Sequence, residues 1–191
     1  LCAGITTYSP LARWNIAKGD KVAIVGLGGL GHMGVQIAKA RGADVTVISR
    51  TLNKAEIAAQ LGADRIIATE DSDFSREHKR QFDFILCTIS ASLNLQDYLR
   101  MLKPHGIMAV VGLPSEALSL QLGSLILGGK VLAGSNIGGI RETQEMLDFC
   151  GEHGLGAWIE KISVDEVDTA YDRVVAGDVK FRFVIDTATF E

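Results

Sequence analysis

The sequence predicts an α/β fold, a doubly wound parallel sheet covered by helices on both faces. Three observations lead to this prediction. Short apolar runs recur through residues 18–137 with helical patterns between them, so strand and helix alternate. The runs are continuous rather than alternating, which is typical of strands buried on both faces. Glycine is frequent (21 residues) and proline rare (3), which favours tight turns and short loops.

The repeating unit contains six expected strands and the helices between them. The strands are the apolar runs at residues 22–25, 45–48, 65–68, 84–87, 107–111 and 131–133. Apolar residues recur at helical spacing from Leu30 to Ala38, and a further helix is expected over 93–102. Another is expected from Thr51 to Leu61, with Thr51 as its N-cap and Gly62 just past its C-cap. The charged stretch 70–80 is expected to be a solvated loop or helix.

The pattern changes on both sides of this unit. Residues 141–149 predict an amphipathic helix, 158–162 an extended segment, 164–175 a helix and 181–185 a last strand. We therefore expect three sections: a lead-in over 1–17, the repeating unit over 18–137, and a tail over 138–191.

Composition and charge exclude several classes of protein. Hydrophobic residues make up 47% and charged residues 22%, as in a globular domain and unlike a disordered chain. The net charge of -4, without a basic run, argues against a nucleic-acid partner. The apolar runs are too short for a bilayer, so we expect no membrane partner. Three widely spaced cysteines (Cys2, Cys87 and Cys150) predict no disulfide framework and a reducing, cytoplasmic location. The absence of Gly-x-Ser-x-Gly excludes the usual serine hydrolase turn.

A glycine motif follows the first expected strand. Residues 26–31 read Gly-Leu-Gly-Gly-Leu-Gly, and this G-x-G-x-x-G opens a helix. Gly26 permits the tight turn, Gly28 lets the backbone approach a pyrophosphate, and Gly31 lets the helix pack closely on the strand. The helix N-terminus then offers unpaired N–H groups to phosphates. The alternative is a glycine turn that only makes room for the chain.

The end of the second expected strand indicates which dinucleotide would bind. An NAD site usually has Asp or Glu at this point, whereas this chain has Ser49, Arg50 and Thr51, followed by Lys54. A hydroxyl, a guanidinium and an ammonium suit the extra phosphate of NADP(H). The alternative is that the two cations are surface charges and Thr51 only caps its helix.

Four segments of the chain resemble one enzyme family. They are residues 1–11 (LCAGITTYSPL), 25–32 (VGLGGLGH), 133–139 (AGSNIGG) and 182–186 (RFVID). Together they resemble the zinc-containing medium-chain alcohol dehydrogenases, of the cinnamyl alcohol dehydrogenase type. The resemblance implies a Rossmann, NADP-binding domain over 18–137, with 1–17 and 138–191 belonging to the catalytic domain. It also implies that the N-terminal catalytic domain, with its other zinc ligands, precedes Leu1.

The resemblance assigns roles to individual residues. Cys2 matches one cysteine of the catalytic zinc site, and no catalytic residue falls within the chain. The implied cofactor contacts are Thr6 at the nicotinamide; Gly26, Gly28, Gly29, Leu30 and Gly31 at the pyrophosphate; Ser49, Arg50 and Lys54 at the adenosine ribose; Val111 and Leu113 at the carboxamide; Ser135, Asn136 and Ile137 at the nicotinamide; and Arg182 at the pyrophosphate.

The implied activity is hydride transfer between NADPH and an aldehyde or primary alcohol, with zinc in the full-length enzyme as Lewis acid. We expect the chain alone to bind NADP(H) without turnover, and to form a homodimer through the sheet edge in Leu118–Ala133. Two alternatives stay open. A zinc-free quinone or enone reductase would share the glycine turn but not the cysteine at position 2, and a nucleotide-sensing module would bind the cofactor without any reduction.

Overall fold

We describe a computed structural model of the chain, which covers residues 1–71 and 73–190. Contacts divide the chain into two compact units, Leu1–Leu155 and Gly156–Glu191. The first unit contains the whole repeating unit together with the lead-in and the first part of the tail. The expected sections 1–17, 18–137 and 138–191 concern the family origin of each segment, and that division stays a prediction.

Six parallel strands form the sheet of the first unit, in the order β3-β2-β1-β4-β5-β6. They are β1 (Lys21–Val25), β2 (Asp44–Ser49), β3 (Arg65–Ala68), β4 (Phe82–Cys87), β5 (Leu102–Val110) and β6 (Val131–Gly134). This order confirms the predicted doubly wound sheet. The order reverses between β1 and β4, and a crevice for a ligand opens at such a point, beyond the carboxyl ends of the strands.

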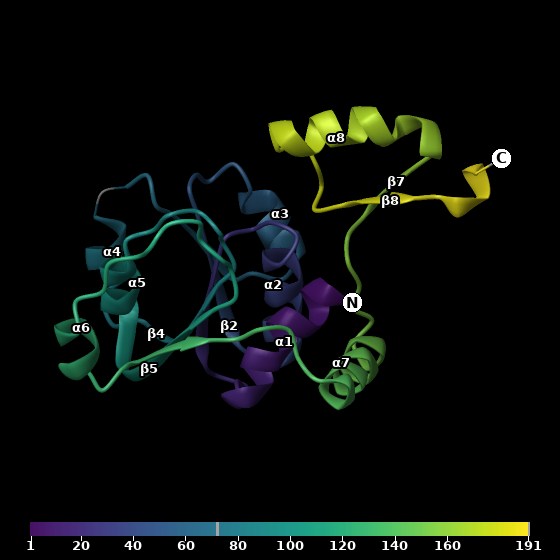
Figure 1. Ribbon diagram of the computed structural model, residues 1–191. Helices are drawn as coiled ribbons and strands as arrows, with labels where there is room; N and C mark the ends of the chain where they lie inside the picture. Colours follow the sequence, from purple (N-terminus) through teal and green to yellow (C-terminus); the bar gives the residue numbers. More distant parts are fainter. Residues whose placement is uncertain (72, 191) are drawn as a thin grey trace. The chain divides into compact units, whose positions relative to one another are not determined.

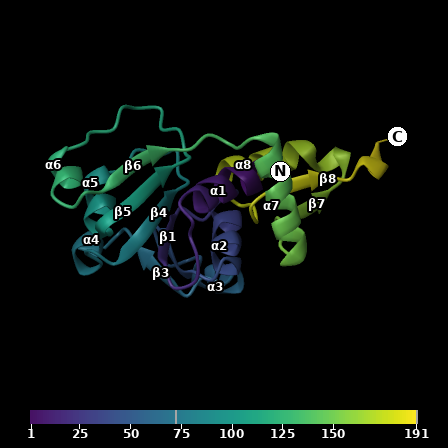
Figure 2. The same ribbon diagram turned by 90° about the horizontal axis from the view of Figure 1, so that it is seen from below.

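Helices cover both faces of the sheet (Figures 1 and 2). On one face lie α1 (Cys2–Arg13), α2 (Gly31–Ala40) and α3 (Ala55–Gln60), and on the other α4 (Phe74–Glu77), α5 (Leu95–Met101) and α6 (Gly123–Ile126). Successive side chains of each strand point to opposite faces of the sheet. Ile24 and Leu86 lie under Gly34 of α2, whereas Val25 and Ile85 join the core cluster with α4 and α5. Both sets are buried, which explains the continuous apolar runs.

Helix α1 was not predicted from the sequence. Its residues 3–11 are all buried, with Pro10 inside the helix, so it has no polar face to produce an amphipathic pattern. It packs against α2 and against α7 (Ile140–Glu152). A Cβ on Gly4 would lie 2.9 Å from the Met146 sulfur, so glycine permits the close approach of α1 and α7. The lead-in is therefore part of the core of the first unit.

The predicted cap of the helix after β2 was wrong. Helix α3 begins at Ala55 with Lys54 at the N-cap position, and the Thr51 hydroxyl instead accepts the Asn53 N–H at 3.3 Å. Residues 50–54 therefore form a loop at the sheet edge. Helix α5 also begins later than expected, because the Asn94 side chain caps it by accepting the Gln96 N–H.

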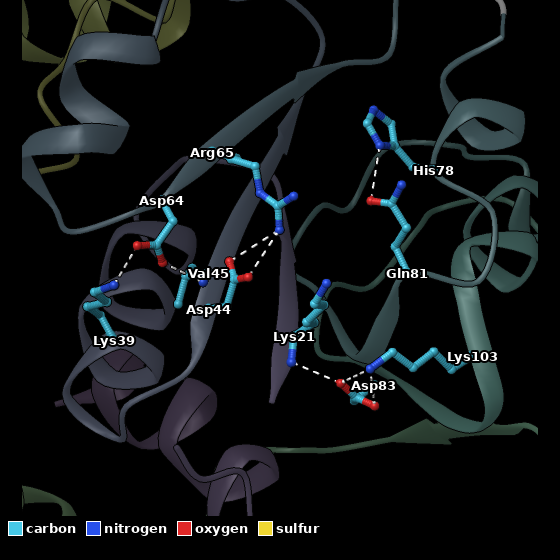
Figure 3. Close-up of polar contacts among 10 residues, drawn as sticks. All are labelled: Lys21, Lys39, Asp44, Val45, Asp64, Arg65, His78, Gln81, Asp83 and Lys103. Carbon is cyan, nitrogen blue, oxygen red and sulfur yellow. Dashed lines mark hydrogen bonds and ion pairs between the residues drawn. The ribbon is translucent and has the colours of Figure 1, made fainter. Parts of the chain in front are cut away.

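Paired charges fasten the amino ends of the strands (Figure 3). The Asp83 carboxylate on β4 accepts the Lys21 N–H of β1 at 2.9 Å and the Lys103 ammonium of β5 at 2.6 Å. The Asp64 carboxylate accepts the Val45 N–H at 2.8 Å and the Lys39 ammonium at 2.6 Å. A further pair joins the starts of β2 and β3 through Asp44 and Arg65. Each carboxylate thus ties together segments far apart in the sequence.

The second unit holds a two-stranded parallel sheet, β7 (Glu160–Ile162) and β8 (Phe183–Ile185), and the helix α8 (Val167–Ala176). The predicted helix over 164–175 begins as a short 3-10 turn, η1 (Val164–Glu166), with a capping box between Ser163 and Glu166. A second turn, η2 (Thr187–Thr189), ends the unit. No helix in the described part of the chain is long and apolar enough to cross a membrane.

Candidate functional site

The predicted site residues of the first unit gather largely at the carboxyl ends of the strands. Gly26 follows β1, Ser49 ends β2, Val111 follows β5 and Ser135 follows β6. Because the strands are parallel, these positions share one edge of the sheet. This is the edge at which doubly wound folds bind ligands.

The first and last glycines of the turn are required by the fold itself. Gly26 has φ +90°, and its N–H donates to the Ile48 oxygen at 2.8 Å. A Cβ on Gly26 would lie 2.4 Å from the Ile89 side chain. A Cβ on Gly31 would lie 2.0 Å from the Gly26 carbonyl oxygen. A side chain at position 31 would require a shift of the backbone, and one at position 26 would strain the backbone and displace the Ile89 side chain.

Gly28, in contrast, is not required by any packing within the chain. A Cβ built there would meet no atom within 4 Å, and the residue is exposed. The N–H groups of Gly28, Gly29 and Leu30 have no partner among the described residues, and no side chain caps the start of α2. An open surface with free amides at a helix N-terminus suits an anion such as a phosphate. The turn therefore fits a dinucleotide pyrophosphate.

Two further residues support the turn and were not predicted. The Thr88 hydroxyl, just after β4, donates to the Val25 oxygen at 2.8 Å and so ties β4 to β1 at the turn. A Cβ on Gly112, just after β5, would lie 2.0 Å from the Ile89 carbonyl oxygen. Thr88 directly follows β4 and Gly112 lies two residues past the end of β5, and these positions are the signal that could have indicated them. The His32 N–H is used within α2, where it donates to the Gly28 oxygen at 3.0 Å, and the ring is buried.

At the end of β2 the structure brings one of the two predicted cations to the turn. The Lys54 ammonium donates to the Leu27 carbonyl oxygen at 3.0 Å. The Arg50 side chain is exposed and has no hydrogen-bond or ion-pair partner in residues 1–71 and 73–190. Ser49 ends β2 itself, and the Glu70 N–H donates to the Arg50 oxygen at 3.1 Å. One fixed and one free cation thus border this edge.

The ends of β5 and β6 carry the predicted nicotinamide side of the site. The Val111 N–H donates to the Cys87 oxygen at 3.0 Å, and the Leu113 side chain is 87% exposed. The Ser135 hydroxyl is buried without a partner in the described residues, and Asn136 is exposed. Ile137 is also exposed and has φ +53°, a left-handed conformation that a β-branched residue seldom adopts.

Helix α1 lies next to this segment. A Cβ on Gly138 would lie 2.7 Å from the Ile5 side chain, so the chain after Ile137 rests on α1. The Cys2 sulfur lies 3.8 Å from the Thr6 hydroxyl one turn further along the helix. The structure therefore places Cys2 and Thr6 on the helix that contacts the β6 end of the site.

The described residues do not form a zinc site on their own. A catalytic zinc takes three protein ligands, and no three His, Cys, Asp or Glu side chains in the described part of the chain lie close enough to hold a metal. Cys2 as a zinc ligand stays a prediction. Burial raises the pKa of the Cys87 thiol and that of the Cys150 thiol, so both stay protonated and behave as small apolar side chains.

Arg182 belongs to the second unit. Its carbonyl oxygen accepts the Glu160 N–H at 2.9 Å, and its Nε is buried without a partner in the described residues. Its predicted contact with a pyrophosphate stays a prediction.

Comparisons with known proteins give the same picture. The chain is 52% identical over 186 residues to "NADP-dependent alcohol dehydrogenase C" of Mycobacterium bovis, a match that covers 97% of this chain and 54% of that protein. Among solved structures it is similar to a cinnamyl alcohol dehydrogenase of Sorghum bicolor (TM-score 0.95, 44% identity, 100% of this chain and 55% of that one). It is also similar to the enzyme of Helicobacter pylori complexed with NADP(H) (TM-score 0.88, 43% identity, 98% and 54%).

The chain spans about half the length of the curated relatives it matches. Residues 29–152, more than half of the chain, match the family described as "Zinc-binding dehydrogenase". The match includes residues 29–31 of the glycine turn and all strands from β2 to β6, and it confirms the family that the sequence resembles. This chain belongs to the zinc-binding dehydrogenase family.

Proposed function

We propose that this chain is the cofactor-binding part of a zinc-dependent, NADP(H)-linked alcohol dehydrogenase or aldehyde reductase. The observation that carries the proposal is the turn after β1, where Gly28 leaves open space beside free backbone amides. The named relatives support the reaction class, since one is called NADP-dependent alcohol dehydrogenase and another was solved with NADP(H).

The residues of the chain would bind and orient the cofactor. The amides of Gly28, Gly29 and Leu30 would donate to the pyrophosphate, and α2 would add the positive end of its dipole. The NADPH, when bound, supplies the hydride. Ser135, Asn136 and Ile137 would face the nicotinamide, and the loop at Val111 and Leu113 its carboxamide. Holding the ring in one orientation lowers the barrier to hydride transfer.

The proposed preference for NADP(H) depends on Arg50. Its guanidinium has no partner within the described residues, and the segment Ser49–Lys54 contains no carboxylate. We expect titration calorimetry to show tighter binding of NADP⁺ than of NAD⁺. Arg50→Asp should weaken NADP⁺ binding by about 1–3 kcal/mol, roughly 5- to 150-fold, because it replaces a cation facing the extra phosphate by an anion.

Arg141→Asp is the matched control for this variant. Arg141 is 95% exposed on its side chain in the first turn of α7, where an acidic residue is tolerated by the helix dipole. It changes the net charge equally and should leave both affinities unchanged. Equal binding of NAD⁺ and NADP⁺ by the unsubstituted chain would contradict the proposed preference.

We also propose that the chain alone does not reduce aldehydes. Cys2 is the only predicted zinc ligand, and the described residues do not form a metal site. Purified chain should bind NADPH yet show no zinc-dependent oxidation of it in the presence of cinnamaldehyde. Clear turnover would contradict this part of the proposal and leave the cofactor assignment intact.

The outer edge of β6 is proposed to pair with a second copy of the chain. β6 is the last strand in the order of the sheet, and no strand of the described residues lies beside its outer edge. Large apolar side chains in Leu118–Ala133 are exposed, including Leu127 at 89% and Val131 at 41%. Exposed apolar edge strands commonly pair with another chain. Light scattering should show a dimer, and Val131→Lys should yield a monomer that still binds NADP⁺.

A further inference from the structure

A pocket lies at the opposite end of the sheet from the glycine turn. It has a volume of about 370 Å³. Its walls come from the segment before β4, both ends of α5, the start of β5, α6 with the residues on either side of it, and the residue before β6. Strands β4, β5 and β6 begin here, so the pocket belongs to the amino-end edge.

Four cationic side chains line this pocket, and no carboxylate does: Lys79, Arg80, Arg100 and Lys130. The charge of Arg100 is paired with a residue that does not line the pocket. Its guanidinium lies 3.3 Å from the Asp97 carboxylate and donates to the Ser75 hydroxyl at 2.9 Å. Lys79 and Arg80 have no side-chain partner among the described residues. The chain as a whole has more acidic residues (23) than basic ones (19), yet this pocket is lined by cations and by no carboxylate.

The cations are close enough to repel each other. Burial, followed by Arg80 and Lys79, lowers the pKa of the Lys130 ammonium. That ammonium donates to the Leu99 carbonyl oxygen, which holds it at the pocket wall. An anion placed between the three groups would replace their repulsion by attraction.

Two more features suit a ligand rather than a solvated surface. Arg80 has φ +56°, and its N–H donates to the Arg100 oxygen at 3.1 Å. The backbone therefore holds an arginine in a conformation that favours glycine or asparagine. The Nε2 of Gln96, also in the lining, is buried without a partner among the described residues. A buried, unpaired donor is costly unless something accepts from it.

We propose that the pocket lined by Lys79, Arg80, Arg100 and Lys130 binds a small phosphate-bearing anion, at a site separate from the glycine turn. Ammonium and guanidinium groups bind phosphate oxygens through charge-assisted hydrogen bonds. The phosphate could be inorganic or part of a nucleotide. The proposal does not depend on the function assigned to the carboxyl-end edge.

The test is calorimetry on the 191-residue chain with inorganic pyrophosphate, with and without saturating NADP⁺. We expect saturable binding with a Kd below about 1 mM that persists when NADP⁺ is present. The variant Lys79→Gln/Arg80→Asn should weaken this binding at least tenfold and leave NADP⁺ affinity unchanged. Asparagine is chosen because it tolerates the left-handed backbone at position 80.

The matched control is Lys18→Gln/Arg141→Gln, which removes two exposed cations that lie outside the pocket. Equal weakening by both double variants would show non-specific attraction and overturn the proposal. Complete loss of pyrophosphate binding in NADP⁺ would also overturn it, because the glycine turn would then be the binding site. The comparison of the two double variants locates the pyrophosphate site without use of NADP⁺. The pocket can therefore be tested even if the chain fails to bind NADP⁺.

A second arm distinguishes the sources of the phosphate. Similar affinities for pyrophosphate and adenosine 5′-diphosphate would support recognition of the phosphates alone. Tighter binding of the nucleotide, also lost in Lys79→Gln/Arg80→Asn, would support a nucleotide ligand. Light scattering should accompany each titration, since α6 lines the pocket and also lies in the proposed dimer edge. Binding by a monomer that disappears on dimer formation would overturn the proposal.

Discussion

The two ends of the six-stranded sheet are built differently from the same strands. At the amino ends of β1 to β5, carboxylates such as Asp83 and Asp64 are paired with cations and backbone N–H groups. At the carboxyl ends, the N–H groups of the glycine turn are free and Arg50 has no partner among the described residues. The pairing fastens the sheet, whereas the unpaired groups are available to a ligand. Among these residues, the difference separates those that stabilise the fold from those proposed to bind the cofactor.

The largest effect is expected where the two roles meet, at Gly31. Gly31→Ala places a Cβ 2.0 Å from the Gly26 oxygen, so α2 must move away from β1. We expect the free energy of unfolding to fall by about 3 kcal/mol, with loss of NADP⁺ binding. Urea denaturation and calorimetry measure the two effects. Unchanged stability would show that the packing of the turn is looser than described.

Gly28→Ala is the matched variant, which should change cofactor affinity without changing the packing of the turn. Its Cβ meets no atom of the chain within 4 Å, so stability should change by less than about 0.5 kcal/mol. Affinity for NADP⁺ should nevertheless fall about tenfold, equivalent to about 1.4 kcal/mol, because the methyl group stands between the amides and the pyrophosphate. Equal losses of stability in the Gly28 and Gly31 variants would contradict the distinction drawn between the two glycines.

At the other end of the sheet, Asp83→Ala should lower stability by about 1–2 kcal/mol and leave NADP⁺ affinity unchanged. The substitution removes the acceptor of the Lys21 N–H and of the Lys103 ammonium, both partly exposed. Asp73→Ala serves as the control. The Asp73 carboxylate pairs with Arg76, and both side chains are exposed, so this substitution should lower stability by less than about 0.5 kcal/mol. A change in cofactor affinity on Asp83→Ala would show that the two ends are coupled.

The smallest effect concerns pH. Partial burial acts to raise the pKa of Asp64, but the Lys39 ammonium and the Val45 N–H outweigh it and hold the pKa below its usual 3.8. A carboxylate with a lowered pKa stabilises the fold above its unfolded pKa, and this contribution is lost as pH falls through the folded value. We expect the Asp64 carboxylate to contribute less than about 1 kcal/mol to the free energy of unfolding, because its side chain is partly exposed. The stability advantage over Asp64→Asn at pH 7, measured by urea denaturation, should therefore shrink as pH falls below 3.8 and vanish only below the lowered pKa of the folded state.

The strands of the sheet were predictable because burial on both faces leaves unbroken apolar runs, as in β1 and β4. Helix α1 was not predictable in the same way, since its burial on every side removes the amphipathic pattern, and its sequence includes Gly4 and Pro10. The cap at Thr51 failed because the loop Arg50–Lys54 uses that hydroxyl in a local turn. Within the site, the glycine spacing indicated the turn. The positions of Thr88 and Gly112 just past two strands could have indicated these residues, but the contacts that they make between strands could not be read from the sequence.

Ile137 shows what such a site costs the molecule. A β-branched residue at φ +53° is less stable there than asparagine, by about 1–2 kcal/mol. A variant library screened only for heat resistance would therefore replace this isoleucine early. The surviving proteins would melt later and would lack the apolar group that the chain presents beside its proposed reaction centre. Selection for heat resistance and selection for catalysis would therefore favour different residues at position 137.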